Sequence, residues 1–198
     1  MDDAGTFLAE PKPTEPAQQL YAEDLDGDGY VMNLTRLWAH APAVHDGIVT
    51  LLGAAGTAGD LTFRQKCILV SATASTMGDS YCSLAWGTRL AGEAGDETAA
   101  AVLSGDDAGL EPTEQALARW ARALARDPNG TTPDDVQALR DTGFTDDQIF
   151  AVTAYVGGRV AFSTVNDALG ALPDAELMER VPEAVRAAVD WGRPPAPN

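Results

Sequence analysis

The sequence predicts an all-α protein, and three features of the chain support this fold class. Thr62-x-x-Gln65 and Thr145-x-x-Gln148 have the spacing of helix capping boxes, and each precedes an apolar run with helical periodicity. Alanine-rich stretches such as residues 116–125 favour helix over strand. No segment alternates apolar and polar residues between hairpin turns, as a half-buried strand would.

Glycine and proline place the boundaries of the expected helices. A long apolar helix ends at Gly78, and the helix after it ends near Gly92 or Gly95. Pro112 and Pro133 suit the first turn of two later helices, where an N–H group has no intrahelical partner. The predicted helices span residues 16–24, 34–40, 43–55, 62–77, 80–91, 96–103, 112–126, 133–141, 146–170 and 182–190.

The length and composition suit one domain. A chain of 198 residues that is 45% hydrophobic can bury one sizeable core and needs no second globular unit. We therefore predict a single domain over residues 1–198, in which an N-terminal helical segment, 1–60, precedes a main core region, 61–192. The first ten or so residues and residues 193–198 lack periodicity and are expected to be loose tails.

The charge of the chain excludes two classes of partner. Its formal net charge of -17 repels phosphate backbones and anionic lipid surfaces, so we expect no nucleic-acid and no membrane partner. No apolar run approaches the ~18 residues of a spanning helix, and the acidic start of the chain does not have the form of a signal peptide. We expect a cytosolic protein whose two cysteines are thiols.

Residues 79–87, Asp-Ser-Tyr-Cys-Ser-Leu-Ala-Trp-Gly, place one of these cysteines at the start of a helix, directly after the break at Gly78. This unit resembles the core of the carboxymuconolactone decarboxylase and alkylhydroperoxidase D-like family. In that family Cys-x-x-Cys-x-x-x-His opens a helix, and a glutamate lies on the helix before it. A branch that reads Ser-Ser-Tyr-Cys-x-x-Ala-His-Gly is more similar still. The agreeing residues are Ser80, Tyr81, Cys82, Ala85 and Gly87.

The likeness continues through residues 21–25, 29–31 and 33–36 and into the helix after Thr145, so it covers most of the chain. It implies the alkylhydroperoxidase D-like helical bundle, with residues 61–192 as the family core. It also implies a homo-oligomer, because family members associate through helical faces.

The family's functional positions are mostly changed in this chain. The peroxide-attacking cysteine falls on Cys82, while the resolving cysteine falls on Asp79. The histidine falls on Trp86 and the upstream glutamate on Cys67. Only the attacking cysteine is therefore retained, and both histidines of the chain lie in its N-terminal quarter.

Two opposing effects act on Cys82. In the first turn of a helix, free N–H groups and the positive dipole end stabilise a thiolate. The neighbouring Asp79 carboxylate opposes ionisation, because a like charge nearby disfavours the thiolate. Cys67 has two interpretations that remain open: a relocated resolving thiol that faces the same pocket, or a small apolar residue inside a buried helix.

Trp86 is open to two interpretations as well. An indole in place of an imidazole removes an acid–base group and adds apolar area, which turns the site into a binding surface. Ordinary core packing is the other reading, since large aromatic side chains are mostly buried.

The helix over residues 146–170 carries a polar stripe. Tyr155, Arg159, Ser163 and Asn166 recur at spacings of three and four and so share one face. Arg159 is the candidate partner for a carboxylate or enolate oxygen of a substrate, with an intersubunit or surface salt bridge to an acidic residue as the alternative. The adjacent glycine pair, 157–158, would let another helix or a ligand approach closely.

Residues 24–29, Asp-x-Asp-x-Asp-Gly, match the first half of an EF-hand calcium loop. The second half does not match, because position 12 is Thr35 instead of the bidentate glutamate. We expect a loop between helices, no metal site and no cofactor.

Three function classes remain. The first is a diverged, cofactor-independent enzyme of the resembled family that acts on a small organic metabolite. The second is a thiol peroxidase that uses Cys82, and the third is a non-catalytic binding protein on the same fold. The candidate catalytic residues are Cys82, Tyr81 and Asp79, and the candidate substrate-binding residues are Trp86, Cys67, Tyr155, Arg159 and Asn166.

Overall fold

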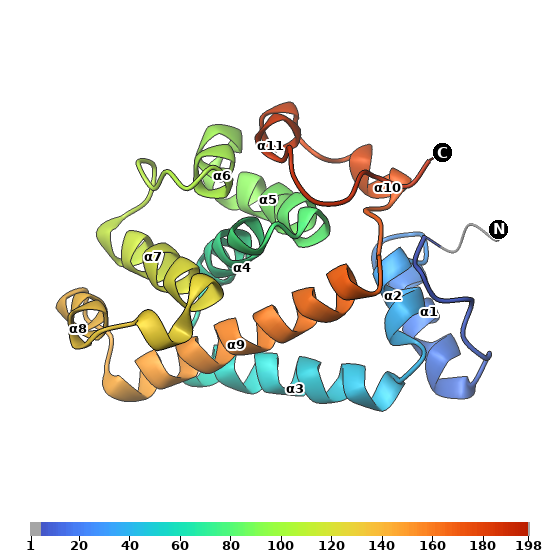
Figure 1. Ribbon diagram of the computed structural model, residues 1–198, viewed down its shortest axis with the longest axis horizontal. Helices are drawn as coiled ribbons and strands as arrows, with labels where there is room; N and C mark the ends of the chain where they lie inside the picture. Colours follow the sequence, from blue (N-terminus) through green and yellow to red (C-terminus); the bar gives the residue numbers. More distant parts are fainter. Residues whose placement is uncertain (1–4, 198) are drawn as a thin grey trace.

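The computed structural model describes residues 5–197, and within this range every regular element is helical. Figure 1 shows a central group of long helices with the N-terminal helices at one end. The longer helices are α1 (Glu15–Gly27), α3 (Pro42–Ala58), α4 (Phe63–Met77), α5 (Ser80–Ala94), α7 (Pro112–Arg126) and α9 (Asp146–Ala168). The shorter ones are α2 (Asn33–Trp38), α6 (Asp96–Leu103), α8 (Pro133–Asp141), α10 (Ala175–Met178), α11 (Glu183–Ala188) and the 3-10 turn η1 (Pro128–Gly130).

The predicted all-α class is confirmed, and so are the capping signals behind it. The Thr62 hydroxyl accepts from the Gln65 N–H while the Gln65 side chain accepts from the Thr62 N–H, and Thr145 with Gln148 repeats this arrangement. Helices α6, α7 and α8 have the predicted bounds, and η1 and α10 are additional. No helix within residues 5–197 is both long and apolar enough to cross a membrane.

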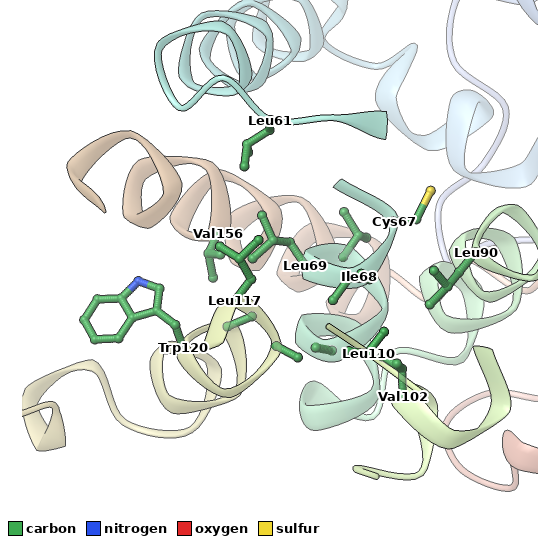
Figure 2. Packing of buried hydrophobic residues seen from close by; sticks show 14 of the residues in the cluster. Leu61, Cys67, Ile68, Leu69, Leu90, Val102, Leu110, Leu117, Trp120 and Val156 are labelled. Carbon is green, nitrogen blue, oxygen red and sulfur yellow. The ribbon is translucent and has the colours of Figure 1, made fainter. Parts of the chain in front are cut away.

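Helix α4 forms the centre of the core, where it packs against α5, α7 and α9. Ile68, Leu69 and Val70 are almost completely buried there, together with Leu117 of α7 and Val156 of α9. Figure 2 shows Leu69 of α4, Leu117 of α7 and Val156 of α9 converging on the same interior. The close packing of these apolar side chains fixes α5 relative to α4 and therefore fixes the position of the first turn of α5.

Helix α3 lies along α9 in the opposite direction (Figure 1). Gly158 permits this approach, because a Cβ atom there would lie 2.9 Å from a methyl carbon of Leu52. This confirms the close contact expected from the glycine pair, and the partner is a helix. Gly157 faces open space.

The described parts of the tails, residues 5–10 and 193–197, are attached to the protein, which corrects the expectation that they are loose; residues 1–4 and 198 lie outside the described residues. The Phe7 N–H donates to the Leu169 carbonyl, and the Arg193 N–H donates to the Ser80 hydroxyl at the start of α5. The Arg193 guanidinium donates to the Asp167 carbonyl. Both tails therefore cover the region where α5 begins and α9 ends.

Candidate functional site

The site is built around the start of α5. Gly78 ends α4 with a φ of 76°, in the left-handed region that glycine adopts at low cost. Asp79 then caps α5, and its Oδ1 atom accepts a hydrogen bond of 2.9 Å from the Cys82 N–H. The sequence thus puts Cys82 in the first turn of α5, with its thiol held between α5 and α9.

The Cys82 sulfur contacts an arginine. The Nη2 atom of Arg159 lies 3.5 Å from Cys82 Sγ and donates to it, and both residues are buried. Burial and the Asp79 carboxylate raise the pKa of the Cys82 thiol far above its usual range, while Arg159 and a hydrogen bond with Ser163 oppose that rise. At neutral pH Cys82 is therefore a protonated thiol.

The Arg159 guanidinium is buried against aromatic rings. Its central carbon lies 5.1 Å from the ring centroid of Trp86 and 4.9 Å from that of Phe162, which are cation–π distances. Within residues 5–197 it forms no ion pair, and its Nε atom has no hydrogen-bond partner. A salt bridge of Arg159 within the described part of this chain is thus excluded, and a salt bridge to another subunit stays a prediction.

Phe162 is itself held in place from behind. The Trp38 ring stacks on it at a centroid separation of 4.8 Å, and the Trp38 Nε1–H donates to Asn166 Oδ1 at 2.9 Å. Asn166 is fully buried, so it fixes the wall of the site without reaching its interior. The predicted substrate contact at Asn166 is therefore corrected to a supporting one.

These groups line a small pocket with a volume of about 130 Å³. Its walls come from the loop after α1, from α2, α5 and α9, and from α10. The lining residues are Asp28, Tyr30, Met32, Leu34, Tyr81, Cys82, Ala85, Trp86, Arg89, Arg159, Phe162 and Leu177. The pocket combines an apolar interior with two arginines, and the Arg89 guanidinium carbon also lies 5.2 Å from the Trp86 ring centroid.

Tyr81 connects the pocket to Asp174, a residue that no sequence pattern indicates. The Tyr81 hydroxyl donates a short hydrogen bond to Asp174 Oδ2, and Asp174 Oδ1 accepts from the Asn33 N–H at 2.7 Å. Burial raises the pKa of Asp174 to about 6, against the opposing effect of these hydrogen bonds, and burial also raises the pKa of Tyr81.

Of the predicted site residues, Tyr81, Cys82, Trp86 and Arg159 line the pocket, and the other four do not. Cys67 and Tyr155 belong to the main hydrophobic core instead. Figure 2 shows Cys67 among the buried core side chains. Burial, and to a smaller extent the negative charge of Glu93, raise the pKa of the Cys67 thiol to about 11. Both cysteines are free thiols, and the apolar interpretation of Cys67 agrees with its position.

Tyr155 lies in the core and Arg159 lines the pocket, although both are on the same face of α9, because that face meets different helices along its length. Tyr155 packs close to Gly56 of α3, one turn before Arg159 reaches Cys82. Asp79 is completely buried below the pocket and acts on Cys82 from there. Its placement as a helix cap corrects the expectation that it lies within the site.

Sequence reasoning missed Phe162, Arg89 and Asp174. Phe162 lies three residues after Arg159 and Arg89 three residues after Trp86, so helical spacing alone could have identified both. Asp174 follows α9 in a loop without periodicity, and nothing in the sequence indicates its contact with Tyr81.

The acidic stretch 24–28 stabilises the turn between α1 and α2. The Asp24 carboxylate accepts a 2.9 Å hydrogen bond from the Met32 N–H and so stabilises the start of α2. Over residues 5–197 there is no group of three or more histidine, cysteine, aspartate or glutamate side chains placed to hold a metal ion.

The arrangement of helices is shared with solved proteins. One is the "alkylhydroperoxidase AhpD core" of an uncharacterized peroxidase-related protein from Ralstonia eutropha JMP134, with a TM-score of 0.77 and 23% identity over 90% of this chain and 98% of that one. The chain has the AhpD-like fold. An uncharacterized peroxidase-related protein from Silicibacter sp. TM1040 shares it, with a TM-score of 0.76 and 17% identity over 87% of this chain and 94% of that one. No protein-family model and no curated protein matches the sequence.

Proposed function

We propose that the pocket binds a small organic acid and that the protein is a cofactor-independent enzyme acting on it by proton transfer. The observation that carries this proposal is the state of Arg159. A guanidinium that is 6% exposed, lines the pocket and lacks an ion-pair partner within residues 5–197 is a buried positive charge open to an anionic ligand. A carboxylate or enolate oxygen of a ligand would supply the missing partner.

The size and walls of the pocket restrict the ligand. A cavity of about 150 Å³ accommodates a molecule the size of benzene, so the 130 Å³ here suits an acid of only a few heavy atoms. Phe162, Leu34 and Leu177 offer apolar surface to its carbon atoms. Trp86 completes the wall, and its ring holds the Arg159 guanidinium by a cation–π contact.

Three polar groups of the pocket have a role in this proposal. Arg159 holds the anionic oxygen and stabilises charge that develops on an enolate. Tyr81 is the group that exchanges a proton with the ligand, since its hydroxyl is already paired with a carboxylate. Cys82 remains a neutral thiol that orients Arg159, because its raised pKa keeps it protonated.

Calorimetric titration with acetate, pyruvate and benzoate tests the proposal. We expect at least one of these acids to bind, and we expect Arg159→Met to weaken that binding at least tenfold. Arg126→Met is the matched control, because Arg126 is an exposed arginine on α7 that does not line the pocket. The affinity of this variant for the acid should equal that of the wild type. Absence of binding by all three acids, or equal binding by Arg159→Met, would overturn the proposal.

A second candidate is a thiol peroxidase, and the 3.5 Å contact between Arg159 and Cys82 supports it. A guanidinium beside a cysteine stabilises the thiolate and polarises a bound hydroperoxide. The Cys82 thiol would lose its proton and attack the terminal peroxide oxygen, which breaks the O–O bond; the departing alkoxide takes up that proton and leaves as the alcohol, and Cys82 becomes a sulfenic acid. An external thiol would then reduce it, because Cys67 does not line the pocket.

Intact mass after reaction with stoichiometric tert-butyl hydroperoxide distinguishes this candidate. A gain of one oxygen atom in the wild type and in Cys67→Ser, but not in Cys82→Ser, supports a peroxidase. Inert cysteines in all three proteins exclude it and leave the organic acid as the remaining candidate.

A further inference from the structure

Tyr81 and Asp174 lie on the boundary between two pockets. Tyr81 lines the candidate pocket, whereas Asp174 lines a second pocket of about 230 Å³ together with Asn33 and Arg36. The hydrogen bond from the Tyr81 hydroxyl to Asp174 Oδ2 joins a lining residue of one pocket to a lining residue of the other. Both side chains are 2% exposed, so this bond is itself shielded from bulk water.

The bond is fixed in position from several directions. Asp174 Oδ1 accepts from the backbone N–H of Asn33 at the start of α2, and Asp174 precedes α10. Tyr81 belongs to the first turn of α5. Three separate elements therefore hold the pair, which is more than a chance contact between two flexible side chains would show.

We infer that Tyr81 and Asp174 form a proton-transfer pair that connects the candidate pocket with the second pocket. The inference rests on the proposed function, because it assigns the route by which a proton leaves the ligand. When Tyr81 accepts a proton from a C–H group of the ligand, its own hydroxyl proton passes to the Asp174 carboxylate. The electron pair of the broken C–H bond stays on the ligand as an enolate beside Arg159, and Asp174 releases the proton to water in the second pocket.

The surroundings of Asp174 suit a group that takes up and releases a proton. Its pKa of about 6 is far nearer to neutrality than that of an exposed carboxylate. The titratable groups around it are Glu176 on α10, Tyr30 and the Arg36 side chain on the wall of the second pocket. A volume of 230 Å³ has room for several water molecules at ~30 Å³ each, and water there would be the acceptor of the proton that Asp174 releases.

The exchange rate of the Tyr81 hydroxyl proton tests the route without any ligand. Tyrosine labelled with carbon-13 at Cζ, in an equal mixture of H₂O and D₂O, gives one NMR line when the hydroxyl exchanges fast and two when it exchanges slowly. We expect one line for Tyr81 in the wild type and two lines in Asp174→Asn, whose amide cannot carry the proton. Tyr81→Phe assigns the resonance.

Asp167→Asn is the matched control, because burial also raises the pKa of Asp167 to about 6 but this residue does not contact Tyr81. It should leave the single line unchanged. In the wild type alone, exchange should slow as pH falls from 7 to 5, since the accepting carboxylate disappears. This measurement holds even if Asp174→Asn does not fold.

The outcomes separate the inference from the proposed function. If the Tyr81 hydroxyl exchanges equally fast in Asp174→Asn, or equally fast at pH 5 and pH 7, the route is wrong whatever the protein binds. If the route is found but no small acid binds, the proposed function fails and the proton pathway stands. If pyruvate binds, incorporation of deuterium into its methyl group should fall at least a hundredfold in Asp174→Asn with an unchanged Kd. Deuterium incorporation that is unaffected by this change would show that the pair does not serve the ligand.

Discussion

Cys82 experiences charges of opposite sign from its two neighbours. Asp79 accepts from its backbone N–H and raises the pKa of the thiol, whereas Arg159 donates to the sulfur and lowers it. Burial decides the balance, because an apolar environment disfavours the thiolate more than one guanidinium can restore. The reactivity of Cys82 should therefore respond strongly to the charge at position 79.

We predict that Asp79→Asn makes Cys82 more reactive. Asparagine keeps the capping oxygen but removes the negative charge, so the pKa of Cys82 falls and the thiolate fraction rises at every pH below that pKa. Alkylation by iodoacetamide at pH 8, in a Cys67→Ser background, should be at least tenfold faster than with Asp79 present. An unchanged rate would mean that access to the pocket, and not ionisation, limits the reaction.

A second prediction concerns Asp174 and the pH dependence of stability. Its pKa is about 6 in the folded protein and 3.8 without the fold, so between these values the folded state holds the proton more tightly than the unfolded state. Stability from this group is therefore highest below pH 4 and is lost as pH rises through about 6. Relative to Asp174→Asn, the wild type should lose up to about 3 kcal/mol between pH 4 and pH 7. Urea unfolding of both proteins across this range measures the difference, and parallel curves would contradict it.

Helix α5 depends on a glycine for its packing. A Cβ atom at Gly87 would lie 2.8 Å from a methyl carbon of Leu103 in α6 and 2.9 Å from one of Val185 in α11. Since real Cβ atoms do not approach so closely, α6 and α11 would have to move apart from α5. Gly92 in the same helix has nothing within 4 Å of its Cβ position.

These two glycines should respond oppositely to the same substitution. Gly87→Ala is expected to destabilise the protein by about 1–3 kcal/mol through overpacking. Gly92→Ala is expected to stabilise it by up to ~1 kcal/mol, because alanine has the higher helix propensity. Chemical denaturation of the pair gives both values, and a shift of the same sign in both variants would refute the packing argument.

Much of the architecture at this scale was predictable from the sequence. The bounds of α6, α7 and α8 were predicted because proline or an acidic first turn marks the start of each helix. The four residues of α10 and the three of η1 are too short to show any periodicity. Helix starts are local in sequence, so the position of Cys82 in the first turn of α5 followed directly.

The site was predictable only where one element determines it. Cys82 and Trp86 lie one turn apart on α5, and Arg159 was found from the polar face of α9. The same face wrongly included Tyr155 and Asn166, because the identity of the neighbouring helix changes along α9 and the sequence does not record it. Asp174 lies 93 residues from Tyr81, and such a contact exists only after the chain has folded. The roles of these residues in catalysis stay predictions.

The molecule as a whole is strongly acidic, yet helix α3 carries almost no charge. Asp46 is the single charged side chain of α3 unless His45 is protonated, and Val44 and Leu51 of this helix are 61% and 45% exposed. Phe150, near the start of the adjacent α9, is 77% exposed. Exposed apolar side chains of this size favour contact with another protein surface. Two copies of so acidic a chain also repel each other least where they meet through α3, which carries almost no charge.

We therefore predict that the protein self-associates through α3 and the start of α9. Phe150→Glu should shift the sedimentation coefficient to that of a smaller species, and added salt should strengthen wild-type association by screening the repulsion between copies. Leu25→Glu is the control, since Leu25 is 54% exposed on the acidic helix α1. A wild type that sediments as a monomer at all concentrations would disprove this expectation.

The position of Trp86 gives the protein an optical property. Of its four tryptophans, Trp86 lines the pocket, while Trp38, Trp120 and Trp191 do not. A ligand that draws the Arg159 guanidinium away from the indole face changes the surroundings of this one emitter, so its fluorescence should change in intensity or wavelength as the pocket fills. Trp86→Phe should abolish that change, whereas the other three indoles contribute a constant background. The pocket would then report its own occupancy without any added dye.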